Sequence, residues 1–249
     1  MTDSPLPEYA KLLADVVDMF DVYMDPRVTS APDSPAMQEL QAACEQSCQA
    51  GVWGEEPVRR TYGLALMQYH AALEHGKAMV ALTSGAFTAV QAIVQARALV
   101  ELAGQVWWLL EPGIGHVGRV ERLQIVRYRS AVEGQRAAEA DGIPETAYEQ
   151  YTETMAQVAD YSRKLDLAVP VRSKPDRTYI CGSQKLPSAT KLVQGLFDKV
   201  DVPSVYNLYS GYAHGHPFAL WREYAEESGS AGLRYQPLAS IFRVLGVLA

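Results

Sequence analysis

The sequence has little cysteine and little charge for its length. Its 249 residues include three cysteines, and 20% of them are charged. Three cysteines are a sparse and odd-numbered set, which excludes a disulfide-stapled scaffold and favours a reducing compartment. The 48% of hydrophobic residues are too many for a disordered chain. The first residues lack the basic-then-apolar order of a secretory signal. We therefore expect a folded, cytoplasmic protein.

Several motifs are also missing. The sequence contains no Gly-x-x-x-x-Gly-Lys-Ser/Thr loop for nucleotide phosphates and no Gly-x-Ser-x-Gly turn for a nucleophilic serine. His70 and His75 are five residues apart, a spacing that does not place two ligands on one helix face. Cys44 and Cys48 have no second cysteine pair to complete a zinc site. We therefore expect neither a metal nor a cofactor.

A membrane span is not expected either. The most apolar stretch, residues 83–110, contains Arg97 and Glu101 near its middle, and three glutamines. Two opposite charges at the centre of a lipid bilayer would be costly. This stretch is therefore predicted to be the central, mostly buried helix of a protein without a membrane partner.

The spacing of hydrophobic residues is helical almost throughout the chain. No run alternates as a β-strand should, although 178–181 and 233–236 could each form a brief extended segment. The predicted helices are 5–24, 35–50, 57–82, 83–110, 117–140, 145–165, 188–197, 201–226 with a break at Gly215, and 237–249. Thr83 or Ser84 is expected to cap the apolar helix. The pattern predicts an all-α, single-domain bundle of about eight or nine helices over residues 1–249.

Arg97 and Glu101 are the first candidate site residues. They are four residues apart, so they share a helix face, together with Trp108 one to two turns later. A charged pair in a hydrophobic core must be paired and hydrogen-bonded, because each ion otherwise costs several kcal/mol. The pair therefore indicates either a structural contact that fixes the helix or a preformed polar pocket.

The second candidate is the segment from Tyr206 to His214. Ser210 and His214 are four residues apart, with Asn207 one turn before the serine and Tyr212 between them. The predicted helix ends just after the histidine, where the helix dipole favours a protonated imidazole. A hydroxyl, an amide and an imidazole at one helix end are typical of a site, although a buried histidine that bonds a carbonyl explains them equally well. We expect Arg97 and Glu101 to face Ser210 and His214 across the core, because buried polar groups are most easily satisfied by each other.

These segments carry a resemblance to a known superfamily. The stretches ARALVE (96–101), WWLLEP (107–112) and YNLYSGYAHG (206–215) resemble a group of helical proteins from actinobacteria. The pairing of an Arg-x-x-x-Glu helix with a Ser-x-x-x-His-Gly helix is similar to the HEPN-like superfamily of helical bundles. The resemblance covers about residues 62–220. It implies an HEPN-like fold, two chains that pair through apolar helix faces, and metal-independent cleavage of RNA.

The chain departs from the nucleolytic members in one respect. Those members carry an arginine and a histidine four to six residues apart on one helix, whereas no arginine lies between Arg177 and Arg222. The resemblance therefore assigns the histidine to His214 and requires Arg97, on another helix, as its partner. In this interpretation Arg97, Glu101, Ser210 and His214 are catalytic, and the ligand-binding residues are Tyr206, Asn207, Tyr212 and Trp108.

Basic residues gather in the second half of the chain. Residues 163–199 contain eight basic and three acidic residues, while the whole chain has a formal charge of −7. An irregular basic segment at about 166–186 could recruit RNA or a small anionic ligand, or it could neutralise acidic faces of the protein. Three functions stay open from the sequence: a ribonuclease-like enzyme, a helical module that binds a small molecule or a partner, and a purely structural polar network.

Overall fold

The computed structural model describes residues 33–50, 53–84, 89–142, 145–174 and 177–199, with Lys11, Ala14, Asp15, Tyr206, Ser210 and Ala213. About 80% of this part is helical, so the all-α class is confirmed. The chain divides into two compact units. Unit 1 comprises Met1–Thr29, Leu66–Trp108 and Ala189–Ala249, and unit 2 comprises Ser30–Ala65 and Leu109–Ser188. The single domain over 1–249 stays a prediction.

Six helices lie in the described part of the chain. They are α2 (Pro35–Ala50), α3 (Glu55–Ser84), α4 (Ala89–Leu110), α5 (Gly115–Asp141), α6 (Glu145–Lys164) and α7 (Ala189–Lys199). Their bounds agree with the predicted helices to within a few residues, with one correction. Thr83 and Ser84 end α3 instead of capping the next helix, which begins at Ala89. The predicted helices 5–24 and 201–226 fall mostly outside the described residues and 237–249 wholly so, and the total of eight or nine stays a prediction.

No helix among the described residues is long and apolar enough to cross a bilayer. The apolar helix α4 shows why. Arg97, Glu101 and three glutamines lie along its 22 residues. Its apolar side is instead buried within unit 1.

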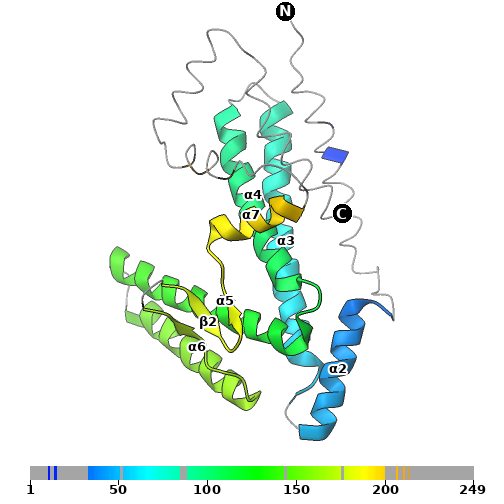
Figure 1. Ribbon diagram of the computed structural model, residues 1–249. Coiled ribbons are helices and arrows are strands. Elements are labelled where there is room, and N and C mark those ends of the chain that lie inside the picture. Colours follow the sequence, from blue (N-terminus) through cyan, green and yellow to red (C-terminus); the bar gives the residue numbers. More distant parts are fainter. Residues whose placement is uncertain are drawn as a thin grey trace, which may run out of the picture. The chain divides into compact units, whose positions relative to one another are not determined.

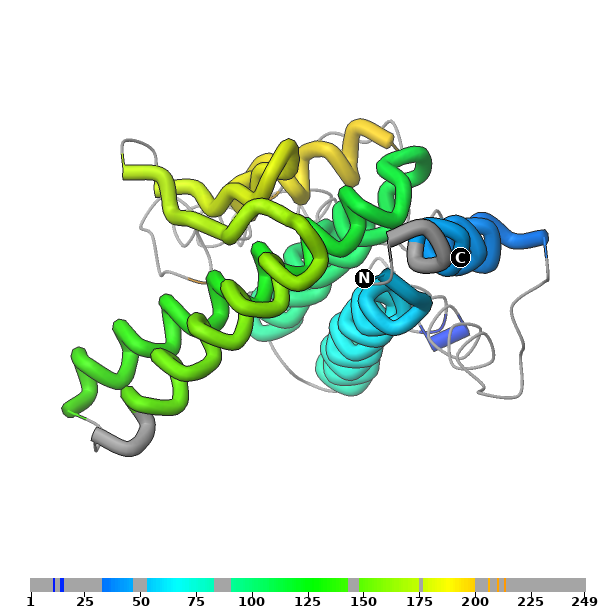
Figure 2. Tube along the Cα trace, turned by 90° about the horizontal axis from the view of Figure 1, so that it is seen from below, coloured from blue at the N-terminus to red at the C-terminus, as the bar shows by residue number. Residues whose placement is uncertain are grey.

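Unit 2 is built around the α5–α6 hairpin, whose helices run side by side (Figures 1 and 2). Gly142 ends α5 with a left-handed backbone, φ +62°, and donates its N–H to the carbonyl of Ala138. This geometry is the common glycine stop signal of a helix. Helix α2 packs against α5 from another direction.

A small antiparallel sheet covers part of α5 (Figure 1). Its strands are β1 (Val171–Arg172), β2 (Tyr179–Cys181) and β3 (Gln184–Lys185), in the order β1-β2-β3. The expectation of an irregular segment at 166–186 is therefore wrong in part, although β2 coincides with the extended segment suggested at 178–181. Strands of two or three residues are too short to show the alternation by which a strand is recognised.

The core of unit 2 joins α2, α3, α5 and the end of α6. The indole N–H of Trp53 donates to the carbonyl oxygen of Leu165 at 3.1 Å, which satisfies the one polar atom of a buried ring. The buried residues that form this cluster are Leu40, Ala43, Trp53, Val58, Val120 and Leu165.

Unit 1 contains the antiparallel segments of α3 and α4. Their register is marked by two hydrogen bonds, from Gln68 Nε2 to Gln105 Oε1 at 3.2 Å and between His75 Nδ1 and Gln95 Oε1 at 2.7 Å. Helix α7 packs on α4 at Gly104. A Cβ at this glycine would lie 3.2 Å from the backbone of Leu192, so the absence of a side chain permits the close approach.

Candidate functional site

Arg97 and Glu101 lie on α4 at the edge of its buried side. Ala96, Val100 and Ala103 on the same helix are buried, while the side chains of Arg97 and Glu101 are 21% and 28% exposed. The Arg97 Nε donates to Glu101 Oε1 at 2.8 Å. The sequence predicted a pair within the core, and the structure places it instead where solvent reaches both groups.

Tyr206 completes a three-residue contact. Its ring is buried, and its hydroxyl donates to Glu101 Oε1 at 2.6 Å. The guanidinium carbon of Arg97 lies 5.9 Å from the centre of the same ring, within the range of a cation–π contact. We refer to these three residues as the Arg97 cluster. All of them belong to unit 1.

The electrostatics of the Arg97 cluster favour one protonation state. Burial raises the pKa of the Tyr206 phenol, and the hydrogen bond to Glu101 raises it further, so the hydroxyl stays a donor at neutral pH. Burial acts to lower the pKa of Arg97, but the hydrogen bond and charge of Glu101, together with the contact to Tyr206, outweigh it, and the net pKa is raised. The cluster therefore holds one cation, one anion and one hydroxyl donor in fixed relation.

This arrangement is suited to holding an oxyanion. A guanidinium is a planar fork of five N–H donors, and a carboxylate that fixes its orientation reduces the entropy lost when a ligand binds. The Glu101 carboxylate orients both Arg97 and Tyr206 through one oxygen atom. The same geometry would also suit an electrostatic clamp in catalysis.

The remaining predicted site residues divide into two groups. Trp108 is buried in α4, and Ser210 is a partly buried helical residue one turn after Tyr206. Asn207, Tyr212 and His214 lie outside the described residues, so their part in the site stays a prediction. Tyr206 contacts Glu101, and the expectation that Arg97 and Glu101 face Ser210 and His214 stays a prediction.

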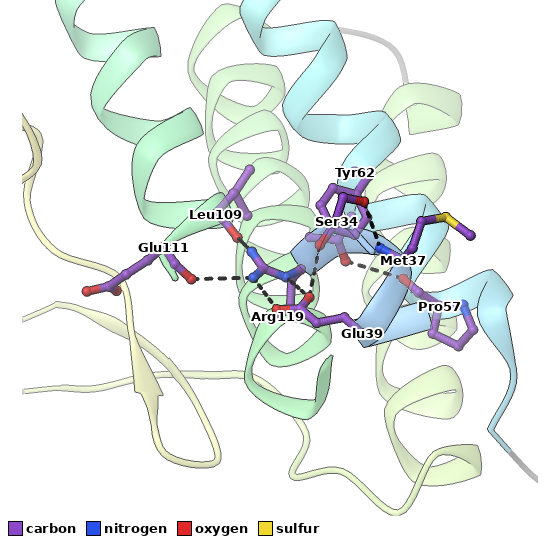
Figure 3. A network of polar contacts seen from close by, with 9 residues as sticks. Ser34, Met37, Glu39, Pro57, Tyr62, Leu109, Glu111 and Arg119 are labelled. Carbon is purple, nitrogen blue, oxygen red and sulfur yellow. Dashed lines mark hydrogen bonds and ion pairs between the residues drawn. The ribbon is translucent and has the colours of Figure 1, made fainter. Parts of the chain in front are cut away.

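Unit 2 contains a polar cluster that the sequence analysis missed. Arg119 of α5 is 3% exposed and forms a two-pronged contact with Glu39 of α2, through its Nε and Nη2 (Figure 3). The Tyr62 hydroxyl donates to the same carboxylate at 3.0 Å. The guanidinium carbon of Arg119 lies 5.3 Å from the centre of the Tyr62 ring.

Arg119 also closes the end of a helix. It donates to the carbonyl oxygens of Leu109 at 2.6 Å and Glu111 at 3.3 Å (Figure 3). These carbonyls lie at the C-terminus of α4, where the last four carbonyls lack partners within the helix and the dipole favours a cation. Arg119 is thus buried, and each of its three guanidinium nitrogens donates a hydrogen bond, which is typical of a structural ion pair.

Two further charged residues of α5 hold the small sheet. Arg122 donates to Gln184 Oε1 of β3 and to Glu111 Oε2, both at 2.7 Å. Glu121 accepts hydrogen bonds from the hydroxyl and the backbone N–H of Ser183, in the turn between β2 and β3. Burial raises the pKa of Glu121, and these two hydrogen bonds oppose the change. These contacts fasten the hairpin to the helix.

One feature of the sequence could have indicated this cluster. In the segment GRVERLQIV (118–126), charged residues are interleaved with apolar ones, which indicates that some of the charges are buried. Gly113, Gly115 and Gly118, the last of which begins this segment, have the Gly-x-Gly-x-x-Gly spacing of a dinucleotide-binding turn. That motif requires a strand before the turn and a helix after it. Here the glycines connect the helices α4 and α5, so the spacing does not support dinucleotide binding.

Among the residues that the structure describes, no three histidine, cysteine or acidic side chains are grouped as metal ligands. Comparison with protein-family models, with curated proteins and with solved structures gives no match. The HEPN-like relationship and the pairing of two chains therefore stay predictions, and function must be argued from the site itself.

Proposed function

We propose that this chain binds a phosphate-bearing anionic ligand, RNA in the first instance, at the Arg97 cluster. The observation that supports the proposal is the shared contact of Glu101 with Arg97 and Tyr206. It holds the Arg97 guanidinium in place at a position that solvent partly reaches, while the buried Tyr206 donates its one hydroxyl hydrogen to the same carboxylate. The exposed Lys191 and Lys199 of α7, in the same unit, add positive charge.

A more specific form of the proposal is metal-independent cleavage of RNA. In this form His214 is the general base that takes the proton of a ribose 2′-hydroxyl, and Arg97 stabilises the charge that develops on the phosphate. Ser210 positions the substrate. This form rests on the resemblance of the 206–215 segment, and the Arg97 cluster supports the anion-binding part of it.

Binding is tested by fluorescence anisotropy with a short single-stranded RNA in the presence of a chelator. Arg97→Gln is expected to weaken binding about tenfold or more, because a charge-assisted hydrogen bond contributes about 1.5–3 kcal/mol and 1.4 kcal/mol is a factor of ten. The matched control is Arg59→Gln. Arg59 contacts Glu55 at the same four-residue spacing, but both side chains are about half exposed, and its loss should change the affinity by less than about twofold.

Equal affinities of the two variants would contradict the proposal, as would a folded wild-type protein that binds neither RNA nor a small phosphate ester. Cleavage is followed on the same RNA by gel electrophoresis, with His214→Ala as the variant. Loss of cleavage in a folded His214→Ala protein is the result that the enzyme form predicts. RNA that is bound but stays intact would overturn the enzyme form and leave a binding module.

A further inference from the structure

Strand β1 is an edge strand of the small sheet, because the strand order among the described residues is β1-β2-β3. Val171 pairs with Ile180, and two residues later Ser173 donates its N–H to the carbonyl of Thr178 at 2.7 Å. Along an antiparallel ladder, pairs that exchange hydrogen bonds alternate with pairs that do not. Arg172, between these two pairs, therefore directs its own N–H and C=O away from β2, toward the open edge.

The side chain of Arg172 has no anionic partner among the residues that the structure describes. Its guanidinium carbon lies 5.8 Å from the centre of the Tyr179 ring, which belongs to the residue opposite it on β2. The Arg172 Nε is buried and has no hydrogen-bond partner in the described part of the chain. A guanidinium is best satisfied by a carboxylate, which can accept two parallel N–H bonds. The position beside Arg172 therefore favours an acidic side chain.

The two faces of β1 differ in character. Tyr179 and Cys181 of β2 are buried, and the Tyr179 hydroxyl donates to Glu133 of α5 at 2.5 Å, so this face of the sheet lies toward α5. Successive residues of a strand point to opposite faces. Arg172 shares the face of Tyr179, whereas Val171 lies on the outer face and is 54% exposed. A strand added at this edge would place one residue beside Arg172 and its neighbours beside the apolar Val171.

The charge of this segment indicates the chemistry of a partner. Residues 171–185 contain four basic residues and one acidic residue, which are Arg172, Lys174, Arg177 and Lys185, and Asp176. A positive surface favours an acidic partner. Single-stranded RNA is the less suitable partner, because its bases are recognised by stacking on exposed aromatic rings and the one aromatic residue of the three strands, Tyr179, is buried.

The length of the edge is also restricted. Pro170, directly before β1, has no N–H to donate, so the edge ends there. A short edge that begins at a proline resists indefinite growth of the sheet. The open edge therefore suits one short strand with a matching pattern.

We propose that the open edge of β1 binds an extended peptide segment in which acidic and apolar residues alternate. The peptide adds an antiparallel strand to the sheet, and its backbone pairs with the N–H and C=O of Arg172. The acidic side chain opposite Arg172 accepts hydrogen bonds from its guanidinium, and the apolar neighbours pack beside Val171. Strand β1 belongs to unit 2 and the Arg97 cluster to unit 1, so this proposal and the proposed function can fail independently.

The test is fluorescence anisotropy of the full chain with a labelled peptide of about seven residues, a usual strand length, in which valine and glutamate alternate. A second peptide carries lysine in place of glutamate, and a third carries N-methyl groups on the glutamate amides. Each is expected to bind at least about tenfold more weakly, the second through loss of the charge-assisted bonds and the third because it cannot donate to the Arg172 carbonyl. A wild-type protein that binds no peptide, or binds the first and third equally, would overturn the proposal.

Variants of the chain locate the site. Arg172→Gln should weaken binding of the valine–glutamate peptide about tenfold, whereas Arg59→Gln, an exposed arginine of the same unit, should change it by less than about twofold. Arg172→Pro also removes the outward N–H without removing a hydrogen bond to β2, so it should abolish binding. If Arg172→Pro does not fold, the N-methylated peptide tests the same pairing on the wild type.

The short RNA is the remaining probe. RNA that loses affinity on Arg172→Gln, together with a peptide that does not bind, would overturn the proposal and assign the basic edge to nucleic acid. Equal peptide affinities of Arg172→Gln and Arg59→Gln would also contradict it.

Discussion

The two arginine–glutamate contacts of this protein differ in where their partners come from. Arg119 meets Glu39 across 80 positions of sequence, and both side chains are largely enclosed, at 4% and 15% exposure. Arg97 meets Glu101 one turn away on the same helix, where solvent reaches both groups. A contact between distant segments forms only when the fold forms, whereas a four-residue contact forms with the helix itself. The first pair therefore belongs to the packing of unit 2, and the second is the pair at which we propose that a ligand binds.

The largest expected effect comes from breaking the enclosed pair. Glu39→Gln leaves the Arg119 charge buried without its counter-ion, and removal of one partner of a buried pair costs about 3–5 kcal/mol. Urea unfolding followed by far-UV circular dichroism measures this loss. Glu45→Gln is the control on the same helix, because Glu45 is exposed and accepts only from Gln41 at 3.0 Å among the described residues. A control that loses as much as Glu39→Gln would contradict a structural role for Arg119.

The next largest effect is expected at the turn between β2 and β3. Gly182 has φ +54°, and a Cβ at this position would overlap the Glu121 carboxylate. Gly182→Ala should therefore lower the free energy of unfolding by about 2 kcal/mol or more, from backbone strain and steric overlap together.

Gly63 offers a control of opposite sign. It lies within α3, and nothing surrounds its Cβ position within 4 Å. Gly63→Ala should therefore raise stability by about 0.5–1 kcal/mol. Equal effects of the two substitutions in urea unfolding would show that the glycine at the turn is not required.

A smaller effect is expected in the Arg97 cluster. Tyr206→Phe removes the hydroxyl that donates to Glu101 but keeps the buried ring, so the loss of stability should be about 1 kcal/mol. Tyr148→Phe, at an exposed position of α6, should change stability by less than about 0.5 kcal/mol. A loss of several kcal/mol on Tyr206→Phe would place this cluster with the structural pair instead.

The smallest effect concerns pH. His116 packs edge-on against Trp53, with 5.3 Å between ring centres, and contacts Gln46 Oε1 at 2.5 Å. Burial lowers the pKa of His116, and the negative charge of Glu39 opposes this. The folded state thus binds its proton less readily than the unfolded state. The stability that His116 contributes is present above its ordinary pKa of about 6.5 and is lost as the pH falls through the lowered value.

The measurement for His116 is the urea midpoint of wild type and His116→Gln at about pH 7.5 and about pH 5.5, on either side of that ordinary value. The wild type should lose more stability on acidification than the variant does. A wild type and a variant with parallel pH profiles would show that this imidazole does not contribute to the pH dependence.

Helix positions were the part of the fold that the sequence could predict. Hydrophobic periodicity, Gly142 and Pro112 are local signals, and they placed five of the six described helices to within a few residues. The predicted start of the apolar helix at Thr83 or Ser84 was wrong, because residue types that cap the start of a helix can also stand at the end of one. These two residues end α3. The sheet was missed because its strands are no longer than three residues.

The candidate site could be predicted only where its residues are close in sequence. The spacing of Arg97 and Glu101 indicated their contact, whereas the contact of Glu101 with Tyr206 joins residues 105 positions apart. The pairing of Arg119 with Glu39 is set by the packing of α2 on α5, which no local pattern contains.

The most direct test of this difference between the two pairs is one comparison of stability. Urea unfolding of Arg119→Gln and Arg97→Gln measures how much of the fold depends on each arginine. Arg119→Gln should lose about 3–5 kcal/mol and Arg97→Gln at most about 1 kcal/mol. Equal losses, or a larger loss for Arg97→Gln, would contradict the assignment of the enclosed pair to the fold and the proposal that the partly exposed pair binds a ligand.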